Sequence, residues 1–349
     1  MAGTTMNITD LITEWGVYIN EGQNASKIHE QLWEKNEVEQ FFMRVIENGD
    51  LYKSVYATID DVLQAFDIDF KPSNGVKFYP TTTEMGTFKV DGQIIPDQLR
   101  NSYMAFLAGE GNPDKTRVPF ISWVIQTMII PKQREEYELN VAFHGWKFNG
   151  GSSATPDVNT TTYVRQKNST ITNFRMGNGA MDGIRLWILR HIDRINTVTT
   201  GAWSTDPATF CTQVETFVNA IPEKIRYKMD FLFMSRTLRD RYRLGRRAKY
   251  NANWNQESDL LAIDNSPMRV QGLAAMVGSE MVWCTPPTNR KRPTQSDFTR
   301  FDPQKYDRSL KILADWKKTL AFDVPEFIYI NDQGLTITAQ EVTDRYTES

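Results

Sequence analysis

Cysteine and histidine are scarce in this 349-residue sequence, which contains two cysteines and three histidines. The two thiols, Cys211 and Cys284, are too few for a disulfide framework or a multi-cysteine metal site, and each follows an aromatic residue, which favours burial. His29, His144 and His191 lie far apart along the chain, and no pair has the spacing of metal ligands. We therefore expect neither a metal nor a cofactor.

Long hydrophobic runs are also missing. The longest, Val118 to Ile130, is too short to span a bilayer and contains the polar residues Ser122, Gln126 and Thr127. The first residues, MAGTTMNITDLITEW, show no basic stretch followed by an apolar one, so no secretory signal is expected. Both observations argue against contact with a membrane.

Catalytic motifs are the third absence. The sequence has no Gly-x4-Gly-Lys-Ser/Thr phosphate loop, no His-Glu-x-x-His, no Cys-x-x-Cys and no Gly-x-Ser-x-Gly. No catalytic residue is assigned, and we expect that the protein is not an enzyme. The alternative is a soluble enzyme with an unrecognised pocket in the 138–200 region, where Trp146, Tyr163 and Trp187 would line a cleft.

What the sequence does contain is enough apolar material for a packed core and an uneven charge. Hydrophobic residues make up 40%, charged residues 24% and aromatic residues 12%. Residues 1–72 carry 13 acidic and 5 basic side chains, although the whole chain has a net charge of only −3. We expect this acidic arm and the basic remainder to bind each other, within or between copies; the alternative is that both are solvated faces.

The strongest basic segment is 224–250, which holds ten Lys and Arg against two Asp. Its helical pattern places Arg236, Arg239 and Arg243 on one face, and the positive charge continues through Arg246 and Arg247. We predict that these five arginines contact a neighbouring subunit or face DNA. Aromatic residues are too sparse there for stacking on single-stranded bases.

Periodicity and capping residues predict the local structure. Helices are expected over 8–19, 26–48, 58–66, 99–107, 117–143, 183–195, 206–221 and 235–250. Extended segments are expected over 68–70, 76–80, 87–90, 229–234, 309–324 and 327–330, with two short apolar segments within 268–284. Turns are expected at Gly86 and at Asp91-Gly92, and Pro131 is expected to kink the helix or restart it. Asp206 and Ser235 are the expected helix N-caps. Segment 76–116 lacks the apolar residues for a core of its own and is expected to lie on something else.

The order of these features resembles the major capsid proteins of tailed bacteriophages, which have the Hong Kong 97 fold. An extended segment precedes a long helix from Val118 to Asn140, and Gly183-Ile184 opens a further helix. A helix ending in Ile221-Pro222 is followed by an apolar strand that continues into MSRTL, and the strands KILADW and AFDVPE come last. The resemblance covers most of residues 76–330.

This resemblance implies an α+β fold with an N-terminal helical arm at 1–75, an extended loop at 76–116, a peripheral domain with a spine helix at 117–200 and 301–349, and an axial domain at 201–300. It implies a virion protein, assembled in the cytoplasm of a bacterial host, whose hexamers and pentamers close into an icosahedral shell around double-stranded DNA. Non-specific DNA contact and portal, scaffold or decoration proteins are the further partners implied. A nanocompartment shell of the same fold is the alternative within this class.

Overall fold

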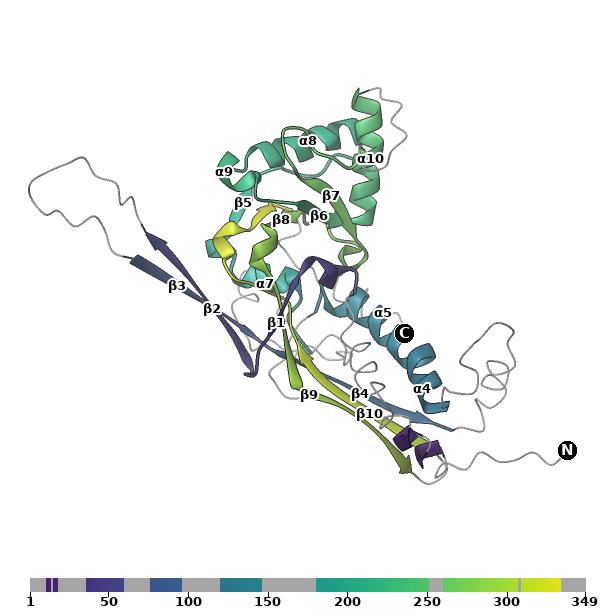
Figure 1. Ribbon diagram of the computed structural model, residues 1–349. Helices are drawn as coiled ribbons and strands as arrows, with labels where there is room; N and C mark the ends of the chain where they lie inside the picture. The colour runs from purple at the N-terminus through teal and green to yellow at the C-terminus, as the bar shows by residue number, and fades with distance from the viewer. Residues whose placement is uncertain are drawn as a thin grey trace, which may run out of the picture.

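The computed structural model describes residues 11–13, 15–17, 36–59, 76–95, 120–145, 180–250, 260–306 and 309–333. The molecule is elongated: a helix-covered body occupies one end, long strands run beside a long helix at the other, and a two-stranded ribbon projects sideways (Figure 1). The larger helical segments are α4 (Phe120–Val124), η2 (Ile125–Ile129), α5 (Ile130–Glu136), η3 (Tyr137–Val141), α7 (Ile184–Arg190), α8 (Pro207–Asn219) and α10 (Arg236–Tyr250). Shorter ones are η1 (Val38–Phe41), η5 (Ile192–Arg194), α9 (Glu223–Arg226), η6 (Ala274–Met276), η7 (Pro287–Asn289) and η8 (Pro325–Phe327).

The strands form two larger sheets and the ribbon. They are β1 (Met43–Ile46), β2 (Leu51–Ile59), β3 (Val76–Glu84), β4 (Gly86–Ile94), β5 (Asn196–Val198), β6 (Phe231–Ser235), β7 (Arg269–Leu273), β8 (Trp283–Cys284), β9 (Arg290–Tyr306), β10 (Ser309–Lys318), β11 (Ala321–Phe322) and β12 (Tyr329–Asn331). The long sheet has the order β1-β9-β10-β4, with β11 also paired to β9. The second sheet has the order β5-β12-β8-β6-β7, and β2 pairs with β3 alone.

The long sheet follows from the alternation of apolar residues in β10. Leu310, Ile312, Ala314 and Trp316 are all buried, while the residues between them are partly exposed. Trp316 stacks on Phe88 of β4 with ring centroids 5.7 Å apart. This buried face of the sheet packs against the end of the long helix, within one hydrophobic cluster.

The long helix is one continuous run from residue 120 to 141, made of α4, η2, α5 and η3. The segments η2 and η3 have π-helical hydrogen bonding, and Pro131 lies in the first turn of α5, so the chain restarts there without a break. The helix predicted over 117–143 is confirmed over residues 120–141.

The second sheet is packed on both faces. One face is covered by α8 and α10, and the hydrophobic cluster between the helices and this face includes Phe210, Val214 and Tyr242. The opposite face contributes Phe233 and Trp283, whose rings stack at 4.3 Å, to the cluster that also holds Trp316 of the long sheet. A single core therefore joins the helix-covered body to the long sheet.

Several local predictions are confirmed. Asp206 caps α8 by accepting a 2.8 Å hydrogen bond from the Thr209 N–H, with Pro207 at the first helical position. The strand predicted over 229–234 is β6, and the Ser235 hydroxyl then accepts from the Leu238 N–H at 3.4 Å to begin α10. The helix after Gly183 and the C-terminal strands are also present.

Other predictions are wrong. The helix expected to run through Phe41 to Val45 is the short turn η1 followed by β1, because β9 provides a strand with which residues 43–46 pair. Gly86 and Asp91-Gly92 are not turns but lie within β4, which pairs with β10 along its whole length. The expected helix start at Thr58 is the end of β2, and β2 and β9 were not predicted. The segments expected at 62–66, 68–70 and 99–107 lie outside the described residues.

The segment that projects from the body differs from the predicted one. It pairs β2 with β3 from Leu51 opposite Glu84 to Ile59 opposite Val76 (Figure 1). The projection therefore begins at Leu51, before the expected start at residue 76, while residues 86–94 belong to the long sheet. Strand β4, in the first part of the 76–116 segment, thus lies on β10 of the same chain.

Candidate functional site

Helix α10, which carries the five predicted arginines, lies against α8 and the second sheet. Its apolar side, with Leu238 and Tyr242, is buried. Two glycines allow close packing: a Cβ on Gly245 would lie 1.9 Å from the Pro207 carbonyl oxygen, and a Cβ on Gly272 of β7 would lie 2.8 Å from Arg239. The helix is thus fixed rigidly on the body.

Arg246 belongs to the interior and not to the predicted contact surface. Its side chain is only 5% exposed, and its Nη2 lies 2.7 Å from Asp264 Oδ1. Its Nη1 donates to the Tyr242 hydroxyl at 3.4 Å. A buried guanidinium with these partners stabilises the packing of α10 on residues 260–264, so Arg246 is removed from the candidate surface.

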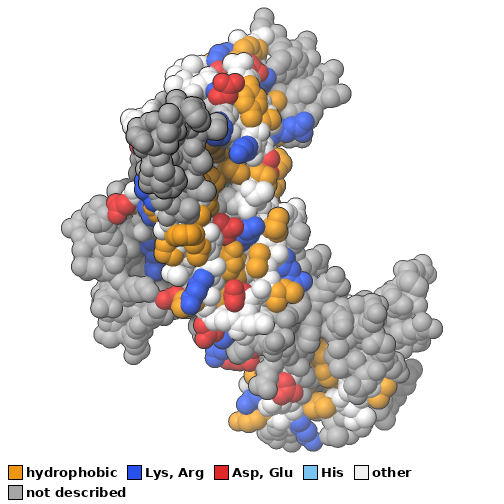
Figure 2. Space-filling view, turned by 60° about the vertical axis from the view of Figure 1, so that its left-hand side comes forward, with side chains coloured by type: hydrophobic (Ala, Val, Ile, Leu, Met, Phe, Trp, Pro, Cys, Tyr) orange, Lys and Arg blue, Asp and Glu red, His pale blue; other side chains and the backbone are white. Residues whose placement is uncertain are grey.

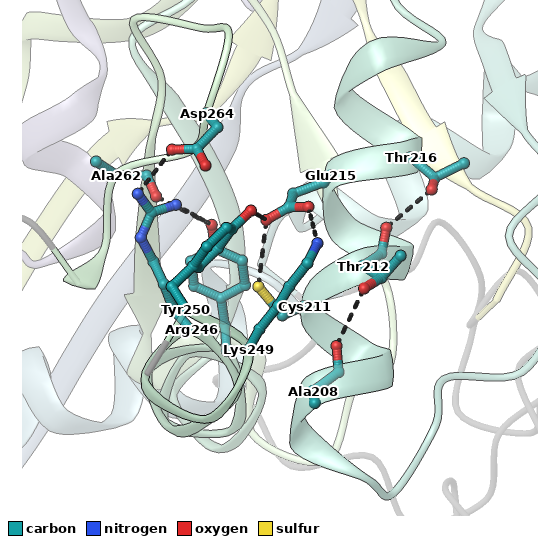
Figure 3. A network of polar contacts seen from close by, with 11 residues as sticks. Ala208, Cys211, Thr212, Glu215, Thr216, Arg246, Lys249, Tyr250, Ala262 and Asp264 are labelled. Atoms are coloured by element: carbon teal, nitrogen blue, oxygen red, sulfur yellow. Dashed lines mark hydrogen bonds and ion pairs between the residues drawn. The ribbon is translucent and has the colours of Figure 1, made fainter. Parts of the chain in front are cut away.

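Glu215 of α8 forms the centre of a polar network with α10 (Figure 3). Its Oε1 accepts from the Tyr250 hydroxyl at 2.8 Å and from the Cys211 thiol at 3.4 Å, and its Oε2 pairs with Lys249. Burial, together with the charge of Glu215, raises the pKa of the Cys211 thiol to about 12, so the thiol is not a nucleophile at neutral pH. The network joins the two helices and leaves Cys211 inert.

The other four arginines differ in how available they are. Arg236 is half exposed and pairs with Glu37 at 2.8 Å. Arg239 pairs with its neighbour Asp240 at 3.0 Å, Arg243 is partly buried, and Arg247 is exposed. Helical spacing puts Arg236, Arg243 and Arg247 along one outward stripe, to which the exposed Leu244 is adjacent. Figure 2 shows basic, acidic and hydrophobic side chains interspersed on the face it presents, without a broad area of one charge.

The acidic arm forms a buried ion-pair cluster with the basic remainder of the chain at Glu39. This carboxylate is completely buried between Arg292, at 2.9 Å, and Lys318, at 2.8 Å, both of which are also buried. Burial raises the pKa of Glu39, but the charges of Lys318 and Arg292 lower it by more, so Glu39 stays ionised. Asp50 pairs with Lys317 at 2.7 Å. For these pairs the predicted attraction between arm and body is confirmed within one copy.

The ribbon is anchored firmly at its base and exposed further out. The Tyr52 hydroxyl donates to Asp323 at 2.6 Å, and the Trp187 indole N–H donates to the Thr83 hydroxyl at 2.9 Å. Beyond this base, Val55 is 63% exposed and Phe78 is 66% exposed. Among the residues that the structure describes, no third strand pairs with this ribbon, so burial of these side chains needs another surface.

Of the three residues considered for an enzyme pocket, Trp187 is the one that the structure describes. Trp187 is buried in the main cluster, bonded to Thr83 and stacked on His191 at 4.1 Å. Trp146 and Tyr163 lie outside the described residues. Among the residues that the structure describes, no group of His, Cys, Asp and Glu is arranged to hold a metal ion.

Comparison with solved structures places this architecture. The capsid of the Myoviridae phage XM1 superposes with a TM-score of 0.50 at 9% identity, over 84% of this chain and 90% of that one. The chain has the Hong Kong 97-type capsid fold. The procapsid of satellite phage P4 is similar at a TM-score of 0.49 and 10% identity, over 88% and 98% of the two chains. A virus-like particle from Pyrococcus furiosus is similar at a TM-score of 0.44 and 9% identity, over 88% of this chain and 96% of that one. No protein-family model matches the sequence, and neither does any curated protein.

The helix 120–141 lies where the sequence predicted the spine helix, and the β2–β3 ribbon includes residues 76–84 of the predicted extended loop. No helix in the described ranges is both long and apolar enough to cross a bilayer. The sequence had pointed to the basic helix, but it had not pointed to the ribbon strand β2 or to the buried Glu39 cluster. One residue in the sequence could have indicated the buried charge cluster. Lys318 falls on the apolar, buried side of the alternating pattern of β10.

Proposed function

We propose that this chain is the major capsid subunit of a tailed bacteriophage, a structural protein without catalytic activity that assembles into an icosahedral shell around double-stranded DNA. The observation that carries the proposal is the capsid fold combined with a ribbon that cannot cover its own apolar side chains. A neighbouring copy supplies the missing cover, so that assembly is driven by burial of residues such as Phe78 and Val55.

The basic stripe on α10 is the second feature that supports assembly. A stripe of Arg236, Arg243 and Arg247 beside Leu244 fits a partner surface that is acidic and partly apolar, which favours a neighbouring subunit over DNA for this face. Contact of other basic residues with packaged DNA would be non-specific and sensitive to salt. We also assign the helix-covered body to the axial position and the long sheet to the peripheral one, with particles forming in the host cytoplasm.

Negative-stain electron microscopy of the expressed full chain tests assembly. Closed particles of uniform size are expected, whereas monodisperse monomers at every protein and salt concentration would contradict the proposal. Phe78→Asp should abolish particles without lowering the melting temperature of the subunit. Val277→Asp, at a residue that is 61% exposed outside the ribbon, is the matched control and should still assemble.

Charge reversal separates the basic helix from the ribbon. Arg243→Glu with Arg247→Glu should weaken assembly, most clearly at low salt, while Lys224→Glu on α9 should not. Double-stranded DNA inside particles recovered from their natural source distinguishes a capsid from a nanocompartment, whose content would be protein cargo.

A further inference from the structure

Three consecutive residues, Glu37, Val38 and Glu39, are each held by a different part of the molecule. Glu37 Oε2 accepts from Arg236 of α10 at 2.8 Å and from the Ala274 N–H at 3.3 Å. The Val38 N–H donates to Glu138 Oε1 of the spine helix at 3.2 Å. Glu39 pairs with β9 and β10, as described above. We call these three residues and Glu138 the junction, because it connects the arm, the spine helix, the long sheet and the helix-covered body.

Glu138 is the one carboxylate of the junction that is balanced mainly by a hydrogen bond. The cations nearby are engaged: Arg236 pairs with Glu37, while Arg292 and Lys318 pair with Glu39. The groups that face Glu138 are the carboxylates of Glu37, which precedes η1, and of Glu39 within η1, together with the Lys318 ammonium from β10 and the Val38 N–H. Tyr137, its neighbour on the helix, lies under the Lys318 ammonium at 3.6 Å and is fully buried.

This setting favours the neutral carboxyl. Burial, followed by the charges of Glu37 and Glu39, raises the pKa of Glu138 from its ordinary value of 4.5 to about 7, although the Val38 N–H and Lys318 act in the opposite direction. A protonated carboxyl still accepts the Val38 N–H through its carbonyl oxygen. Ionisation adds a third negative charge beside two buried or half-buried carboxylates.

We propose that the junction is a pH-responsive lock, closed when Glu138 is protonated and loosened when Glu138 ionises. The closed form binds the proton more tightly than an open form in which the carboxyl is hydrated, so closure is most favourable below pH 4.5. That advantage is lost as the pH rises through about 7. Opening at Val38 also frees Glu37, and with it the tie between the arm and α10. The lock acts within one chain and does not rest on the shell proposal.

Amide hydrogen exchange of the full chain, read by mass spectrometry over residues 36–46, tests the lock. After correction for the intrinsic effect of pH on exchange, protection of this segment should fall about tenfold between pH 6 and pH 8. The amides of α8 serve as the internal reference and should show no such fall. Wild-type protection that is equal at the two pH values would overturn the proposal.

Two variants identify the titrating group. Glu138→Gln retains an acceptor for Val38 but cannot ionise, so its protection should be independent of pH. Glu135→Gln, on the same helix at an exposed carboxylate paired with Lys132, is the matched control and should keep the tenfold fall. A Glu138→Gln protein that still shows the fall refutes the assignment. If Glu138→Gln does not fold, Glu37→Gln decides, because removing that neighbouring charge must shift the midpoint to lower pH.

Discussion

The buried cluster of Glu39, Arg292 and Lys318 contains two cations and one anion, and this imbalance makes the effects of substitution unequal. Glu39→Gln removes the negative charge that pairs with both buried cations in the described part of the chain, Arg292 at 2.9 Å and Lys318 at 2.8 Å. Breaking a buried ion pair in this way costs about 3–5 kcal/mol. Lys318→Met leaves the one-to-one pair of Glu39 and Arg292, at 2.9 Å, and fills the space with a flexible apolar side chain. We expect it to cost less than about 2 kcal/mol.

Urea unfolding of the unassembled subunit, monitored by circular dichroism, measures which substitution lowers the free energy of unfolding more. The double variant, Glu39→Gln with Lys318→Met, should be more stable than Glu39→Gln alone, because it buries one fewer unpaired cation. The lowered pKa of Glu39 further implies that the stabilisation by this cluster is present above pH 4.5 and is lost as the pH falls through that lowered pKa. A Lys318→Met protein at least as unstable as Glu39→Gln would refute the charge-balance reasoning.

Two further predictions concern the packing of the helix-covered body. Gly245→Ala should lower the melting temperature by several degrees, since its methyl group would meet the Pro207 carbonyl at 1.9 Å, whereas Gly16→Ala, with open space around it, should not. Equal melting temperatures would show that α10 can move away from α8 at little cost. The thiols of Cys211 and Cys284 should not react with iodoacetamide at pH 8 in the native protein, because burial raises the pKa of both. Both should react in urea, and rapid native labelling of either would contradict the described burial.

The sequence predicted the elements whose signals are local. Asp206 as N-cap followed by Pro207 predicted α8, and the apolar face of residues 117–143 predicted the long helix, because capping and helical periodicity depend on neighbours in the chain. The spacing of Phe41, Phe42 and Val45 suits a helix as well as a strand, and only the distant partner β9 decides between them.

Strand β9 was missed because its charged residues have partners that lie far away in the sequence. Strand β9 begins Arg-Lys-Arg-Pro and reads as a surface segment, yet Arg290 and Arg292 are buried because Asp230 and Glu39 meet them there. The same reason accounts for Arg246, which helical spacing placed on the contact surface but which Asp264 holds inside. Composition predicts that charges will pair, but not which of them will do so in the core.

The continuous core described above has a consequence for dissecting this protein. Strands β5 and β12 complete the second sheet from outside residues 201–300, and the side of that sheet with Phe233 and Trp283 rests on the long sheet. A recombinant fragment cut at 201 and 300 would therefore lose two strands and present bare aromatic rings to water. Excising residues 201–300 should therefore yield an insoluble product, and any soluble truncation has to include residues 196–198 and 329–331 as well.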